Sequence, residues 1–172
     1  MPIYALGDAV PDVHPDAYIH PDAVVIGRVV IGAEATVWPA AVLRGDDGHI
    51  VVGQRTSVQD GTIVHTTARL DTIIGGSCVI GHNAHLEGCT IEDGSLIGSG
   101  SVVLHGAVVR TGALVGANAV VPNGMEVPSG AMALGVPAKI RPDMVEPDSF
   151  EPAVVSYVER GRWFRNELRR VD

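Results

Sequence analysis

The feature that most constrains this chain is an aliphatic residue that recurs at every sixth position. Between Val13 and Val127, nineteen six-residue units each begin with Val, Ile or Leu, and short breaks interrupt them near 44–51 and 65–73. In 16 of the 19 units, the residue four positions later is Ala, Ser, Thr or Cys. A period of six fits neither an amphipathic helix nor an alternating strand. It is typical of a parallel β-helix, in which three units make one triangular coil and neighbouring coils cover each other's apolar side chains.

The composition agrees with a narrow and repetitive interior. Hydrophobic residues make up 46% of the 172 residues, yet aromatic residues make up only 4%, and glycines number 21. Val, Ile, Leu and Ala can fill a slim prism, and Gly supplies the tight corners. Strand pairing stacks coils about 4.8 Å apart, so roughly six coils would form a prism about 30 Å tall. The predicted fold class is therefore all-β.

The end of the chain is predicted to leave the repeat and form a helix. Gly135 and Pro137 end the six-residue pattern. Residues 151–170 then carry apolar side chains at helical spacing, namely Val154, Tyr157, Val158, Phe164 and Leu168. We expect residues 1–140 to form the β-helix and residues 141–172 to form a helical extension that packs on the prism, so that the chain is a single domain.

The charge and the cysteine content narrow the possible partners. The formal net charge is −8, whereas proteins that bind nucleic acid or anionic membranes present clustered Lys and Arg. We therefore expect neither partner. Cys78 and Cys89 form no CxxC pair, and the N-terminal residues lack the basic and apolar segments of a secretory signal. The sequence favours a cytoplasmic protein.

Polar and ionisable residues gather at or beside the breaks in the repeat. The segments are LRGDDGHI at 43–50, SVQDGTIVH at 57–65 and GHNAHLEGC at 81–89. Loops on a rigid scaffold often carry functional residues. These three segments are therefore the candidate functional regions.

These segments resemble those of the γ-class carbonic anhydrases, which belong to the hexapeptide-repeat superfamily. The similar stretches also include VWPAAVLRGD, LIGSGSVVLHGAVV, LGVPAKIR and a tyrosine in the tail helix, so the resemblance covers nearly the whole chain. It implies a left-handed parallel β-helix and a homotrimer that holds Zn²⁺, or Fe²⁺ or Co²⁺, at each subunit interface. The implied enzyme is a carbonate dehydratase, a lyase whose metal-bound hydroxide converts CO₂ to bicarbonate.

The resemblance also implies a set of metal ligands. His65 and His82 match two of the three histidines that hold the metal in the family, where one subunit supplies two ligands and its neighbour supplies the third. The third position falls on Glu87, and His85 stands two residues earlier. Zinc accepts carboxylate as well as imidazole ligands. Strand alternation places both side chains outside the prism, beside inward-facing Leu86, so either residue could complete the site.

Five further residues match supporting positions of the family. Gln59 corresponds to the residue that orients the metal-bound water. Arg44 and Asp60 correspond to an ion pair across the subunit interface, Asp46 belongs to the same network, and Tyr157 corresponds to a tyrosine near the pocket. The resemblance implies that these residues build the catalytic pocket.

Two other functions remain open. A hexapeptide acyltransferase would use an acyl-CoA or acyl-carrier donor and a histidine general base. A non-catalytic trimeric scaffold or metal-binding protein is favoured by Glu87 at the third ligand position. The remaining histidines have no ligand spacing beside them and are expected to be turn or surface residues: His14, His20, His49 and His105.

Overall fold

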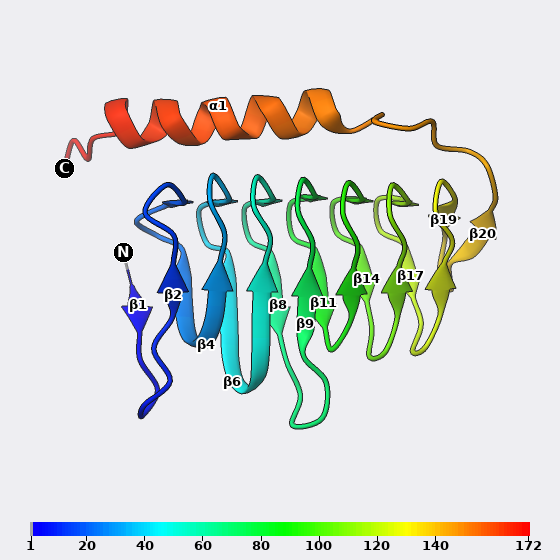
Figure 1. The fold of residues 1–172 in the computed structure, drawn as a ribbon, viewed down its shortest axis with the longest axis horizontal. Helices are drawn as coiled ribbons and strands as arrows, with labels where there is room; N and C mark the ends of the chain where they lie inside the picture. The colour runs from blue at the N-terminus through cyan, green and yellow to red at the C-terminus, as the bar shows by residue number, and fades with distance from the viewer. Residues whose placement is uncertain (1) are drawn as a thin grey trace.

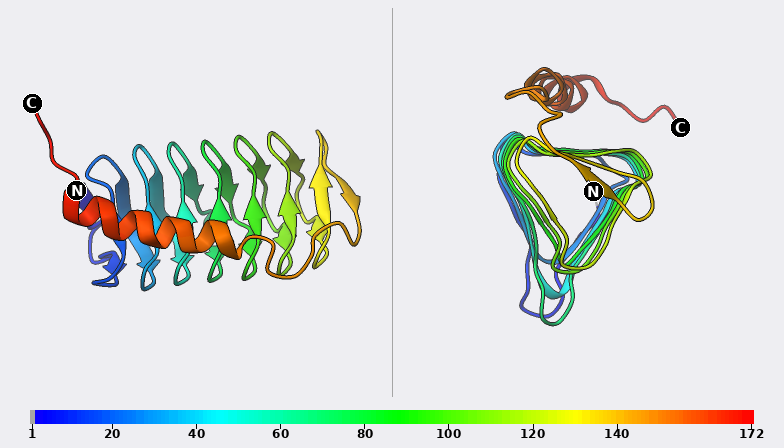
Figure 2. Two further views of the ribbon diagram at one scale, coloured as in Figure 1. Left: turned by 90° about the horizontal axis from the view of Figure 1, so that it is seen from above. Right: turned by 90° about the vertical axis from the view of Figure 1, so that its right-hand side faces the viewer.

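The repeat forms the stacked triangular coil that its period predicts. In the computed structural model, which describes residues 2–172, parallel strands stack as a β-solenoid of about seven turns with one C-terminal helix (Figure 1). Viewed along its axis, the solenoid is a three-sided prism (Figure 2). The predicted all-β parallel fold is confirmed. The expectation of roughly six coils is one turn too low, because strand pairing continues on both sides of the repeat.

The described residues contain twenty strands, most of them only two residues long. In chain order they are β1 (Ile3–Tyr4), β2 (Asp12–Val13), β3 (Tyr18–Ile19), β4 (Val24–Ile31), β5 (Thr36–Val37), β6 (Val42–Val52), β7 (Ser57–Val58), β8 (Ile63–His65), β9 (Thr72–Ile74), β10 (Val79–Ile80), β11 (His85–Glu87), β12 (Thr90–Ile91), β13 (Leu96–Ile97), β14 (Val102–Val103), β15 (Val108–Val109), β16 (Leu114–Val115), β17 (Val120–Val121), β18 (Glu126–Val127), β19 (Met132–Leu134) and β20 (Lys139–Arg141).

Parallel pairing between successive coils holds the prism together. One sheet runs in the order β3, β5, β7, β10, β13, β16, β19 and β20, and β20 is antiparallel to β19. The remaining strands form a second sheet. The first residues of the repeat units pair with one another, as Ile80 does with Val58 on one side and Ile97 on the other. Each of these nineteen aliphatic residues is buried except Val13, which is half-buried, and each buried one contributes about 1.5–3 kcal/mol.

The first break in the repeat is not a loop but part of a long strand. The eleven-residue β6 pairs with β4 across a register shift between Gly27 and Val29. Val29, which occupies a position that usually holds a small residue, and Ile50, which lies in the break, are both buried and support this extension. The second break is a projecting loop at 66–71. The extension and the loop leave the prism at the same corner (Figures 1 and 2).

Helix α1 (Glu151–Glu167) lies along one side of the prism (Figure 2). Trp38 anchors it, with ring centroids 5.1 Å from Phe164 and 5.7 Å from Tyr157. Gly161 is buried where the helix crosses the prism, and a Cβ there would lie 2.6 Å from Thr36 Cγ2. The glycine that weakens the helix therefore permits its close approach.

The helix ends earlier than its apolar pattern predicts. Glu167 is the last helical residue, and Leu168 has extended backbone and a 46% exposed side chain. Leu168 therefore does not extend the buried stripe of Val154 and Val158. Among residues 2–172, no helix combines the length and the apolar character needed to cross a membrane.

Candidate functional site

Two groups of ionisable side chains lie at opposite ends of one face of the prism. The first is the pair His82 and Asp60, which occupy the turns before β11 and β8. His82 Nδ1 lies 2.9 Å from Asp60 Oδ2, and 48% of each side chain is exposed. Within residues 2–172, Nε2 of His82 has no hydrogen-bond or ion-pair partner. The pair therefore presents an imidazole that contacts a carboxylate through one ring nitrogen and has the other ring nitrogen available.

Tight stacking of the two turns brings this pair together. The Asn83 amide donates to the Asp60 carbonyl oxygen at 2.8 Å, and Asn83 adopts a positive φ of 56°. Gly61 has a φ of 69°, and a Cβ there would lie 2.2 Å from Asn83 Oδ1. Gly and Asn are the residues that adopt this conformation most readily. The QDG and GHN segments thus encode two stacked tight turns that present Asp60 and His82.

The second group, called here the Glu87 cluster, consists of Asp46, His65, His85, Glu87 and His105. His65 bridges two carboxylates, with Nδ1 2.9 Å from Glu87 Oε1 and Nε2 3.0 Å from Asp46 Oδ1. The other oxygen of Glu87 lies 3.2 Å from His85 Nε2 and 3.6 Å from His105 Nε2. One carboxylate therefore faces three imidazole rings.

Strand pairing explains why this cluster forms. Glu87 pairs with His65 across β11 and β8, and His65 pairs with Arg44 across β8 and β6. His85 and Glu87 flank the fully buried Leu86 and are themselves partly exposed. The prediction that alternation sends both side chains outward is confirmed.

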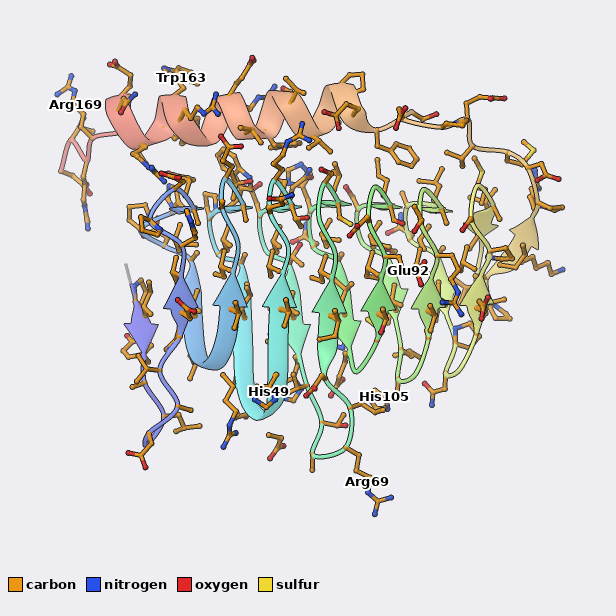
Figure 3. The ribbon with its side chains drawn as sticks, viewed as in Figure 1. His49, Arg69, Glu92, His105, Trp163 and Arg169 are labelled. Carbon is orange, nitrogen blue, oxygen red and sulfur yellow. The ribbon has the colours of Figure 1, made fainter. Side chains whose placement is uncertain are left out.

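The structure adds His105, which the sequence analysis assigned to an ordinary turn. Its Nε2 is buried and makes no hydrogen bond within the described residues, and its contact with Glu87 is the 3.6 Å approach given above. Figure 3 shows His105 toward the same edge of the prism as His49 and the loop that carries Arg69. His105 follows Glu87 by eighteen residues, or three repeat units. That spacing is the sequence signal that could have found it.

Both carboxylates of the cluster are held in the ionised form. Burial raises the pKa of the Asp46 carboxyl, but a backbone hydrogen bond, the hydrogen bond with His65 and the charge of Arg44 bring that pKa below its usual value. Burial likewise raises the pKa of Glu87, and the hydrogen bonds with His65 and His85 together with the charge of His105 bring it below the usual value. At neutral pH both groups therefore only accept hydrogen bonds.

The expected zinc ligands do not converge within one chain. Among residues 2–172, no group of three or more His, Cys, Asp or Glu side chains is arranged to hold a metal ion. His65, His85 and Glu87 lie together, whereas His82 lies in the turn that precedes β11 and pairs with Asp60. Each nitrogen of His65 faces a carboxylate oxygen, so neither is free of a partner within the single chain. These residues of a single chain do not fit the expected metal.

The predicted ion pair between Arg44 and Asp60 is also not formed within one chain. Arg44 pairs with Asp46, which is two residues away on β6. Asp60 pairs with His82 instead. The two predicted partners belong to different groups, so a pair between them would require a second copy of the chain.

The remaining predicted residues lie in different places. Gln59 is 4% exposed and stands beside Asp60 in the turn that follows β7. Tyr157 lies on α1 and packs on Trp38 of the prism. The Arg160 guanidinium lies 5.4 Å from the centre of the Tyr157 ring. Gln59 is therefore next to the His82 pair, whereas Tyr157 is part of the helix packing.

Comparison with known proteins identifies the repeat as that of a transferase family. Residues 71–105 and 88–123 match the family described as Bacterial transferase hexapeptide (six repeats). The carnitine operon protein CaiE from Escherichia coli O1:K1 is 44% identical over 97 residues, which are 56% of this chain. The match spans 50% of the length of CaiE.

Two solved structures match almost the whole chain. A hexapeptide transferase family protein from Anaplasma phagocytophilum is 34% identical with a TM-score of 0.90, over 95% of this chain and 98% of that one. A Bacillus cereus protein described as a candidate acetyltransferase is 31% identical with a TM-score of 0.93, over 96% of this chain and 98% of that one.

These matches correct the expectation of a carbonate dehydratase. The structural relatives are described as transferases, and nothing in the matches is specific to γ-class carbonic anhydrases. The physical reason is that the QDG and GHN segments encode stacked tight turns, and a turn geometry does not specify the chemistry of the residues around it. Because the similarity to the Anaplasma protein spans nearly the full length of both chains, this chain belongs to the hexapeptide transferase family.

Proposed function

We propose that this protein is an acyltransferase that moves an acyl group from a thioester donor, acyl-CoA or an acyl carrier protein, to an amine or hydroxyl acceptor. The descriptions of the relatives support the class of reaction. The observation that carries the proposal is the His82–Asp60 pair. An imidazole oriented by a carboxylate is the arrangement of a general base in acyl transfer.

The pair supplies the proton transfers that this reaction requires. The Asp60 carboxylate lies 2.9 Å from Nδ1 of His82, which favours the proton on Nδ1 and leaves Nε2 as the proton acceptor. Nε2 takes the proton of the amine or hydroxyl as that group attacks the thioester carbonyl carbon. The C–S bond of the tetrahedral intermediate then breaks, and the proton on Nε2 passes to the leaving thiolate. Asp60 stabilises the imidazolium that exists between these two steps.

His82 is better suited to this role than His65. Both ring nitrogens of His65 face carboxylates, and 17% of its side chain is exposed. His82 has one engaged nitrogen, and 48% of its side chain is exposed. In the single chain His82 is therefore more accessible to an acceptor and a thioester than His65 is.

We also propose that the reaction takes place in a homotrimer. Hexapeptide-repeat proteins are commonly trimeric. In a closed ring each interface joins two different patches of the subunit. The His82 pair and the Glu87 cluster lie at opposite ends of one face, so a ring of three copies would bring His82 of one copy toward the Glu87 cluster of the next.

Acetyl-CoA turnover tests the proposed reaction. Purified protein is incubated with acetyl-CoA and a panel of primary amines and alcohols, and free thiol is measured with time. We expect acceptor-dependent thiol release, and we expect His82→Asn to reduce it by about 100-fold or more, since general bases contribute on that scale.

His14→Asn is the matched control, because His14 also stands beside an aspartate in an exposed turn. This variant should retain the wild-type rate. Full activity of His82→Asn would contradict the proposed role of the base. Absence of acyl transfer by the wild type over the whole panel would contradict the proposed activity itself.

A further inference from the structure

The Glu87 cluster lies where the γ-class motif predicts a metal centre, but its atoms are already paired with one another. A histidine that binds zinc directs a lone pair of one ring nitrogen at the metal and donates a hydrogen bond from the other. His65 instead has a carboxylate oxygen at each nitrogen, at 2.9 and 3.0 Å. Each ring nitrogen of His65 is therefore already engaged with a carboxylate oxygen.

Both carboxylate oxygens of Glu87 also have partners within the cluster. Its Oε1 accepts from His65, and its Oε2 lies within 3.2 Å of His85 and 3.6 Å of His105. A metal bound by this carboxylate would compete with three imidazoles at once. It would also draw Glu87 away from the buried Nε2 of His105, which lies 3.6 Å from that carboxylate.

The carboxylate oxygens of the cluster already have partners. Arg44 pairs with Asp46, and His65 lies between Asp46 and Glu87. His85 and His105 lie beside the other oxygen of Glu87. Zinc binds directly to carboxylate oxygens and to free imidazole nitrogens, and in this cluster those atoms face one another.

We propose that the Glu87 cluster is a metal-free hydrogen-bonded network in which the Asp46–His65–Glu87 bridge replaces the zinc centre and ties β6 to β8 and β11. Asp46 comes from the extension of β6, His65 from the end of β8 and Glu87 from the end of β11. The bridge therefore joins three successive coils at the corner where the β6 extension and the 66–71 loop leave the prism. This inference does not depend on the proposed acyl transfer.

Metal content and thermal stability together test the proposal. Full-length protein without a histidine tag is dialysed against excess Zn²⁺ and then against buffer, and bound zinc is measured by mass spectrometry. We expect the wild type to retain far less than stoichiometric zinc, and its Tm to be unchanged by EDTA. We expect His65→Asn to lower Tm without changing the zinc content, because the bridge and not a metal is lost.

Glu87→His is the variant that shows whether the assay can detect a metal at this place. It removes the carboxylate that engages His65 and adds a third imidazole, so we expect it to retain more zinc than the wild type. Stoichiometric zinc in the wild type that is lost in His65→Asn and kept in His14→Asn would overturn the proposal. An unchanged Tm in both His65→Asn and Glu87→Gln would overturn it as well, since no bridge would then be present.

Discussion

At the scale of single residues, the position of a histidine in the coil decides its chemistry. His82 stands in a turn with one nitrogen on a carboxylate. His65 stands at the end of a strand with a carboxylate at each nitrogen. The same side chain is therefore suited to take a proton in one place and to bridge two anions in the other.

Replacing Asp60 by Asn tests how His82 is held. Asp60→Asn keeps the size of the side chain but removes the carboxylate charge that lies 2.9 Å from Nδ1 of His82. We expect thiol release from acetyl-CoA to slow by about 10- to 100-fold, which is less than for His82→Asn, because the imidazole is still present but is no longer held in one tautomer. Asp16→Asn, beside His14 in an exposed turn, is the control. Equal rates for the two variants would rule out an orienting role for Asp60.

The ionised carboxylates of the Glu87 cluster predict a loss of stability in acid. The pKa values of Asp46 and Glu87 are lowered in the folded chain. Their contribution is therefore present above the ordinary carboxyl pKa of about 4, and it is lost as the pH falls through the lower folded values. We expect the double variant Asp46→Asn/Glu87→Gln to be less stable than the wild type at pH 7 and nearly as stable at about pH 2. Circular dichroism melting curves measure this, and a difference in Tm that does not change with pH would contradict it.

At the scale of elements, the turns do more to define the candidate site than the strands do. Most of the two-residue strands of successive coils are nearly interchangeable, since each places one aliphatic residue in the core. The turns differ, and the turns that carry Asp60 and His82 touch through Gly61 and Asn83. A change in this contact should therefore alter both stability and activity.

Alanine substitution at two glycines with nearly equal φ angles distinguishes the cost of the left-handed backbone from the loss of the contact between the two turns. Gly61 has a φ of 69° and Gly94 has a φ of 67°, but a Cβ would meet Asn83 Oδ1 at 2.2 Å at Gly61 and nothing within 4 Å at Gly94. Alanine at either position should cost roughly 1–2 kcal/mol in the free energy of unfolding because of the left-handed backbone. We expect Gly61→Ala to cost more and also to slow thiol release, whereas Gly94→Ala should leave activity unchanged. Urea unfolding and acetyl-CoA turnover measure the two effects, and identical behaviour of the two variants would be the contrary result.

At the scale of the whole molecule, the face between the two groups is the expected contact between copies. Ile63 pairs with His85 across β8 and β11, and 38% of its surface is exposed in the single chain. An aliphatic side chain in that place is suited to burial against another copy. The proposed trimer would therefore cover the residues that separate His82 from the Glu87 cluster.

Light scattering after size exclusion tests this assembly. We expect the wild type to have three times the 17.9 kDa mass of the chain. Ile63→Asp should form smaller species, because a buried carboxylate without a partner opposes association. Val136→Asp, at a position that is 71% exposed, should remain trimeric. A monomeric wild type, or a trimeric Ile63→Asp, would contradict the proposed interface.

Several features of the site could be predicted from the sequence, and others could not. Alternation about Leu86 correctly places His85 and Glu87 outside the prism, because a two-residue period leaves no other choice once Leu86 is buried. His105 could not be predicted from its own hexad, because its contact with Glu87 joins two successive coils. The carbonate dehydratase prediction was wrong because it inferred chemistry from short segments, whereas the relatives that match nearly the whole chain are described as transferases.

The sequence by itself determined the triangular solenoid and its C-terminal helix, because a six-residue period admits one way to bury its aliphatic residues and Gly and Pro mark where it ends. Only the tertiary structure decided which charged side chains meet. The breaks shift the register by amounts that the repeat does not specify, and so the pairing of β6 with β8 and of β8 with β11 brings Asp46, His65 and Glu87 together. Their contacts depend on how coils distant in sequence stack, and the pattern within one coil does not contain that information.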